Sequence, residues 1–73
     1  TTAIRFSLPR NERVRLEIFD LLGKRVATLV DNEVLAAGQH VRQWDARHTA
    51  SGVYIYAVQT ENFREMKKMA LVR

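Results

Sequence analysis

The chain has 73 residues and no cysteine, which leaves room for one small domain and excludes both a disulfide framework and a thiolate metal site. Lysine and arginine number 12 against 8 aspartates and glutamates, so the net charge is +4. Because the two signs are mixed along the chain rather than gathered in one basic patch, we expect an ordinary solvated surface and no nucleic-acid partner.

A period of two dominates the start of the chain, which is typical of half-buried strands. It predicts one strand over 3–8 and a second over 13–20. Pro9 ends the first strand, because proline cannot donate a hydrogen bond to a central sheet ladder. The residues expected to face inward are Ile4, Phe6, Leu8, Val14, Leu16 and Ile18.

A turn should follow the second strand. Asp20 can accept hydrogen bonds from the backbone ahead of it, and Gly23 can take the positive φ that such turns require. The next strand is expected over 24–30. A looser connection closed by glycine is then expected over 31–38, with a short helix over 32–37 as the alternative.

Three further strands are predicted in the second half, over 38–45, 53–60 and 64–73. A polar link over 46–52 and a turn over 61–63 separate them. The stretch 53–60 is the most β-prone, because it is rich in β-branched and aromatic residues. Six to seven short strands at a spacing of about 10 residues predict an all-β fold, a small antiparallel β-sandwich.

No catalytic or ligand-binding constellation is visible in the sequence. His40 falls mid-strand and His48 in the polar link, and neither shows metal-ligand spacing. Ser7 and Ser51 lie outside any nucleophile-elbow pattern. The three glycines are too far apart for a phosphate loop. We therefore expect a non-enzyme with no catalytic residue, no cofactor and no bound metal.

Three aromatic residues leave two interpretations open. Trp44, Tyr54 and Tyr56 could form a platform that stacks on sugars or bases, but their place at the end of a strand and in the most apolar strand favours the core. Tyr54 has a further structural interpretation. A tyrosine early in a late strand can hydrogen-bond back to the backbone and pin a sandwich corner.

Five segments together resemble a known family. In order and spacing they are similar to the C-terminal sorting domains of Bacteroidetes-type proteins exported by the type IX (Por) secretion system. That family is related to the immunoglobulin-like domain of the flagellar hook-capping protein. The segments are TAIRFSLP, LEIFDLLGKRVATLV, AGQHVRQWDA, SGVYIYAVQT and KKMALVR.

Two departures from the family pattern concern packing. Arg42 stands two residues before the tryptophan, where the family usually has an aliphatic residue, and Val41 lies beside it. Either the strand is bulged there, or the arginine stem packs while its head reaches water. Thr49 and Ala50 stand where the family often has leucine before the Ser-Gly-Val-Tyr block.

The resemblance implies an immunoglobulin-like sandwich that acts as a non-catalytic delivery label. Residues 1–73 would be a single C-terminal sorting domain, cut from the end of a larger secreted protein whose signal peptide lies upstream. Its N-terminal cargo would be a hydrolase or adhesin. Its partners would be the outer-membrane secretion translocon and a surface sortase-like peptidase. The protein would cross the periplasm and reach the cell surface or the medium.

The resemblance also implies a set of sorting residues. Their role would be an accessible edge strand with cationic ends, where lysines guard the edge and the backbone remains open to strand addition. The sorting-motif candidates are Gly52, Tyr54, Lys68, Met69, Leu71, Val72 and Arg73.

Two other functions remain open from the sequence. The first is a structural immunoglobulin-like spacer or hook-cap-type module that only packs against neighbours. The second is a carbohydrate-binding module, which requires exposed aromatic residues and is disfavoured if Trp44 is buried. No apolar run approaches the roughly 20 residues that span a bilayer, so we expect no membrane insertion.

Overall fold

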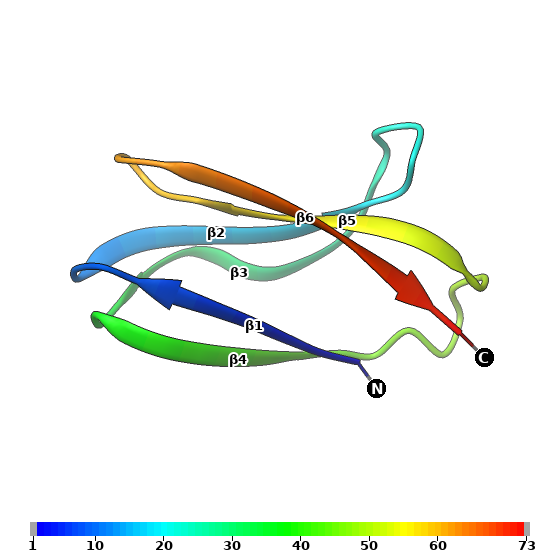
Figure 1. Cartoon of the computed structure of the whole chain (residues 1–73), viewed down its shortest axis with the longest axis horizontal. Helices are drawn as coiled ribbons and strands as arrows, with labels where there is room; N and C mark the ends of the chain where they lie inside the picture. Colours follow the sequence, from blue (N-terminus) through cyan, green and yellow to red (C-terminus); the bar gives the residue numbers. More distant parts are fainter. Residues whose placement is uncertain (1, 73) are drawn as a thin grey trace.

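Two antiparallel sheets make up the part of the chain that the computed structural model describes, residues 2–72 (Figure 1). Strands β1 and β4 pair to form the smaller sheet. The larger sheet has the order β3-β2-β5-β6. The strands are β1 Thr2–Leu8, β2 Glu12–Phe19, β3 Arg25–Leu35, β4 Gly38–Trp44, β5 Gly52–Gln59 and β6 Arg64–Leu71. The prediction of a small antiparallel β-sandwich is confirmed.

The core lies between the two sheets and follows from the period of two. Alternate residues of β1 and β2 are buried, while those between them are exposed or half-buried. Each large aliphatic side chain removed from water in this way stabilises the fold by about 1.5–3 kcal/mol. The core residues are Ile4, Phe6, Leu8, Val14, Leu16, Ile18, Val30, Trp44, Ala46, Tyr54, Val58 and Leu71.

The segment after the third predicted strand differs from expectation. Neither the loose connection over 31–38 nor the short helix over 32–37 exists, because β3 continues to Leu35 and pairs with the start of β2. Asn32 adopts a φ of 57°, and its carbonyl accepts a hydrogen bond from Arg13 Nη1 at 2.9 Å. The far end of this edge strand is mostly exposed, so no alternation of apolar and polar residues marks it in the sequence.

The question raised by Arg42 is settled by the register of the smaller sheet. Strands β1 and β4 pair without a shift, with Ile4 opposite Arg42, so no bulge is present. Arg42 is half-buried, and its Nη1 donates to the Val41 carbonyl at 3.1 Å. Val41 is exposed. The bulge is therefore excluded: Arg42 lies in register opposite the inward-facing Ile4, and its guanidinium is bound to the backbone.

The turn between β2 and β3 forms as predicted. Asp20 Oδ1 accepts hydrogen bonds from the backbone N–H groups of Leu22 and Lys24, both at 2.9 Å, and Gly23 has a φ of 86°. The Asp20 N–H also donates to the Lys24 carbonyl at 2.9 Å. The backbone of this turn is thus held by local bonds that do not involve the two leucine side chains it carries.

Candidate functional site

Most of the sorting-motif candidates lie together on the β5–β6 hairpin. The register places Gly52 opposite Leu71 and Tyr54 opposite Met69, and it places Lys68 opposite Ile55. Strand β6 thus pairs directly with the segment Gly52-Val53-Tyr54, although about 15 residues separate the two along the chain. Val72 follows β6 and is exposed. Arg73 lies outside the described residues.

The candidates divide between the two faces of the larger sheet, because side chains alternate along a strand. Tyr54, Met69 and Leu71 face the core: Tyr54 and Leu71 are buried, and Met69 packs against the core cluster. Lys68 faces the opposite, solvent side and is exposed. The inward group holds the hairpin to the domain, whereas Lys68 is free to meet another molecule.

Tyr54 pins a corner of the sandwich, as its position in the sequence suggested. Its hydroxyl donates a hydrogen bond to the Ala50 carbonyl at 2.7 Å, across the link that leads into β5. The Trp44 ring meets the Tyr54 ring edge-on, with centroids 5.4 Å apart and planes at 75°. Trp44 is only 4% exposed, so it belongs to the core and cannot serve as a sugar-stacking platform.

Removal of the Tyr54 hydroxyl alone should weaken the fold measurably. We expect Tyr54→Phe to lower the free energy of unfolding by about 1–2 kcal/mol, because it leaves the Ala50 carbonyl without its partner. Urea unfolding followed by circular dichroism measures this loss. Tyr56→Phe is the matched control, since its hydroxyl forms no described hydrogen bond, and it should change stability by less than about 0.5 kcal/mol. Equal losses of stability in the two variants would contradict the role of the Tyr54–Ala50 hydrogen bond in holding the corner.

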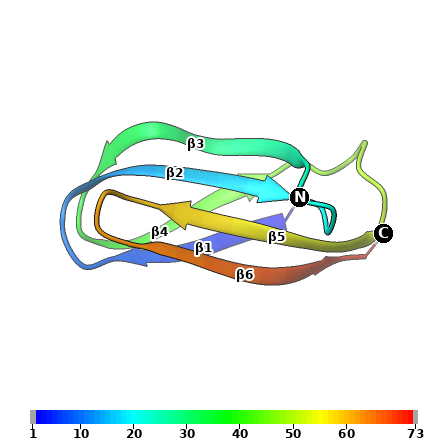
Figure 2. The ribbon, with the colours of Figure 1, turned by 90° about the horizontal axis from the view of Figure 1, so that it is seen from above.

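Strand β6 is an edge strand of the larger sheet. Among the strands of residues 2–72 it pairs only with β5, so within this range the backbone N–H and C=O groups along its other side have no strand partner (Figure 2). Its side chains are mostly exposed and carry four charges from Arg64, Glu65, Lys67 and Lys68. Lys67 lies 3.8 Å from Glu65, while Lys68 forms no ion pair among the described residues. Strand β6 is thus an edge strand of the larger sheet with charged residues along it, and the predicted cationic end at Arg73 lies outside the described residues.

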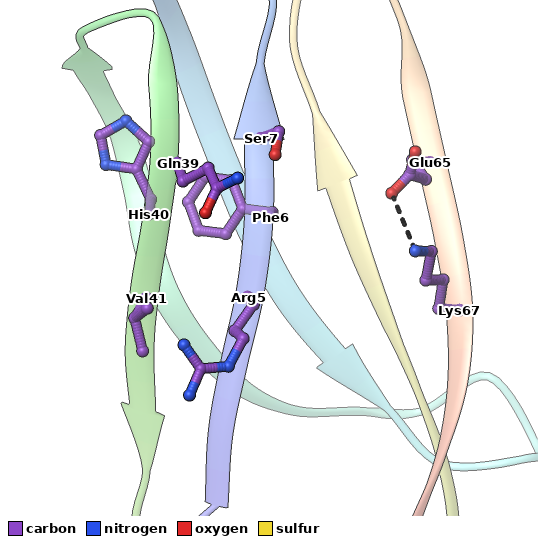
Figure 3. Close-up of a pocket in the computed structure, with 8 residues that line it drawn as sticks. All are labelled: Arg5, Phe6, Ser7, Gln39, His40, Val41, Glu65 and Lys67. Atoms are coloured by element: carbon purple, nitrogen blue, oxygen red, sulfur yellow. Dashed lines mark ion pairs between the residues drawn. The ribbon is translucent and has the colours of Figure 1, made fainter.

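A hollow of about 370 Å³ lies between β1, β4 and β6 (Figure 3). Its lining is largely polar, with Arg5 and Ser7 from β1 and Glu65 and Lys67 from β6. His40 also borders it, but the imidazole stacks on Phe6 with ring centroids 5.4 Å apart. Its Nε2 lies 2.7 Å from the Ala36 carbonyl. The contacts of this histidine are structural.

Two further contacts of titratable groups within residues 2–72 are structural as well. Asp45 and Arg47 form an exposed ion pair of 2.8 Å; hydrogen bonding to Arg47 lowers the pKa of Asp45, and the same contact raises the pKa of Arg47. Buried Glu12 accepts a hydrogen bond from Asn62 Nδ2 at 2.6 Å, which ties the loops at one end together. Within the described range no three of His, Asp and Glu gather where they could hold a metal.

The outward side of β5 was not recognised from the sequence. Val53, Ile55 and Ala57 alternate with the inward residues of the same strand and face away from the smaller sheet. The available signal was the unbroken apolar run over 53–58. Strands that are covered on both faces have such runs, whereas apolar and polar residues alternate in a half-buried strand.

The comparisons with known proteins identify the family. Over residues 2–72 no helix is long and apolar enough to cross a membrane. Searches among curated proteins and among solved structures gave no match. Residues 1–72 match the family described as "Secretion system C-terminal sorting domain". This match confirms the resemblance seen in the five sequence segments. The family is not known to be catalytic. The chain therefore belongs to the secretion system C-terminal sorting domains, the family of sorting signals for type IX secretion.

Proposed function

We propose that the type IX translocon recognises this domain in its folded state, at the free edge of β6, after the protein has crossed the periplasm. Family membership implies a secreted or cell-surface protein, a cargo part N-terminal to the domain and contact with the type IX machinery. The observation that carries the finer proposal is the position of β6. An edge strand with unpaired backbone groups is suited to strand addition by a receptor.

The hairpin candidates would then have two kinds of role. Gly52, Tyr54, Met69 and Leu71 keep β6 in register and attached to the core, so they act through the fold. Lys68 and Val72, together with Arg73, are the residues that the receptor would contact. A sortase-like peptidase at the cell surface would finally separate the domain from its hydrolase or adhesin cargo.

Charge reversal on the last strand tests this proposal. In a reporter protein fused to the N-terminus of the domain, we expect Lys68→Glu combined with Arg73→Glu to lower the surface or medium fraction about tenfold, because two favourable charge contacts with the receptor become repulsive. Cell fractionation of a type IX-competent host measures the reporter in the periplasm and outside the cell. The melting temperature of the purified domain should change little, since Lys68 is exposed and unpaired among the described residues.

The matched control places equal charge changes elsewhere on the surface. Arg5 and Arg10 are exposed in β1 and in the loop after it, so Arg5→Glu with Arg10→Glu alters net charge by the same amount. Secretion should remain at the wild-type level in this control. If both double variants reduce secretion equally, net charge is responsible and the role of the β6 edge is refuted.

A further inference from the structure

The larger sheet has an apolar surface on the side that the smaller sheet does not cover. Strand β5 buries Tyr54 and Val58 on its inner face, where β1 and β4 lie. Its outer face carries Val53, Ile55 and Ala57. A strand that is apolar on both faces is characteristic of a sheet covered on both sides, yet this sheet is covered on one.

The strand register joins the outer side chains into one surface, which we call the outer patch. One cross-strand row contains Phe19 and Ile55, and the next contains Ala57 and Met66. Ala57 is only 3% exposed although it faces outward and lies outside the core cluster, and its cross-strand neighbours are Glu17 and Met66. The residues of the outer patch are Phe19, Val53, Ile55, Ala57, Met66 and Ala70.

The turn that follows β2 extends this apolar surface. Leu22 is 95% exposed, and Leu21 is exposed as well. Figure 1 shows this turn rising on the side of the larger sheet away from β1 and β4, next to the end of the strand that carries Phe19. Turn positions favour Gly, Asn, Asp and Ser, so two exposed leucines contribute nothing to the turn itself. Such a local conflict between sequence and structure is expected at functional sites.

The charges around the outer patch are basic. Arg25 and Lys68 lie at the two ends of the row that contains Phe19 and Ile55. Glu17 and Arg25 form an ion pair of 3.0 Å, so these two charges offset each other and Lys68 carries the positive charge that remains. Lys68 has no ion-pair partner among the described residues. A second copy of this domain would bring like charges together, whereas an acidic rim on a different protein would complement them.

The entry of the chain leaves the outer patch open. Strand β1 begins at Thr2 in the smaller sheet, on the opposite layer of the sandwich (Figure 2). Among the described residues, no strand covers the outer patch.

We propose that the outer patch, together with Leu21 and Leu22, is a docking surface for a component of the type IX machinery whose own surface is apolar at the centre and acidic at its rim. The inference rests on the proposed recognition of the folded domain by that machinery, and it adds a second contact to the β6 edge. The rigid turn acts as an anchor that enters a concave site on the partner. The flat sheet face supplies the surrounding contact.

Two single substitutions outside β6 test the docking surface with the reporter fusion. We expect Leu22→Ser and Val53→Thr each to lower the exported fraction at least about fivefold, the change that corresponds to the roughly 1 kcal/mol that marks an energetically important interface residue. Val41→Thr is the matched control. Val41 is 41% exposed on the smaller sheet and Val53 is 43% exposed, so the same chemical change is made at equal exposure away from the patch.

The outcomes separate the docking surface from sorting itself. If the wild-type fusion stays in the periplasm, the proposed recognition fails. If the wild-type fusion is exported and both patch variants are exported equally well, the docking surface alone is refuted.

Two measurements on the purified domain address other occupants of the patch. The wild-type domain should be monomeric in sedimentation experiments and should not bind phosphatidylglycerol vesicles. A dimer, or vesicle binding, that Leu22→Ser and Val53→Thr abolish would assign the patch to self-association or to a lipid surface and would overturn the proposal. If both variants have the melting temperature of the wild-type domain, a loss of export cannot result from unfolding.

Discussion

Trp44→Ala should destabilise the domain strongly and lower export of its cargo. Trp44 is the largest residue in the core, and it brings β4 of the smaller sheet against Tyr54 of the larger one. Truncation of a buried tryptophan to alanine costs about 3–5 kcal/mol. A domain of this length has a total stability of only about 4–11 kcal/mol. The substitution therefore removes a large part of what holds the two sheets together.

Circular dichroism and urea unfolding of the purified domain measure this effect, and the export assay measures its consequence. Trp44→Phe serves as the control, because it keeps an aromatic ring beside Tyr54 and should retain a cooperative transition. A Trp44→Ala domain that unfolds at the wild-type urea midpoint would contradict the central place of this residue. Export of an unfolded Trp44→Ala domain at the wild-type level would contradict recognition of the folded state.

The sequence predicted the elements whose residues have one buried and one solvated face. Ile4, Phe6 and Leu8 alternate with exposed residues, and the structure places all three in the core. The turn at Asp20 was also predictable, because the hydrogen bonds that hold it involve only that side chain and the adjacent backbone. The same is true of Tyr54, whose partner is only four residues away.

The elements that sequence reasoning missed depend on distant strands. The far end of β3 is exposed, so its pairing with β2 leaves no apolar period between Asp31 and Leu35. The apolar run of β5 was recognised only as the most β-prone stretch, and the sequence did not show that half of it faces outward. Which half faces outward follows from the strand register and from the two-stranded size of the smaller sheet. Neither feature is encoded in a local pattern.

Deletion of residues 67–73 should leave the cargo in the periplasm, and it should also destabilise the domain severely. The deletion removes Leu71 from the core and Met69 from its edge. It also removes the β6 residues that pair with Gly52 and Tyr54, so most of β5 loses its strand partner on that side. Loss of one such buried side chain alone costs about 2–5 kcal/mol. The newly exposed edge of β5 would also promote aggregation, because β5 lacks the charged residues that protect β6.

This deletion changes folding and recognition together, so its interpretation depends on the charge-reversal variant. Thermal unfolding of both purified domains and fractionation of both fusions give four results to compare. If the Lys68 and Arg73 reversal blocks export in a folded domain, β6 is a recognition element as well as a structural one. If only the deletion blocks export, and it does so by unfolding, then β6 contributes through the fold, and recognition must reside on another surface, for which the outer patch is the candidate. Normal export of the deletion variant would refute a sorting role for the last strand.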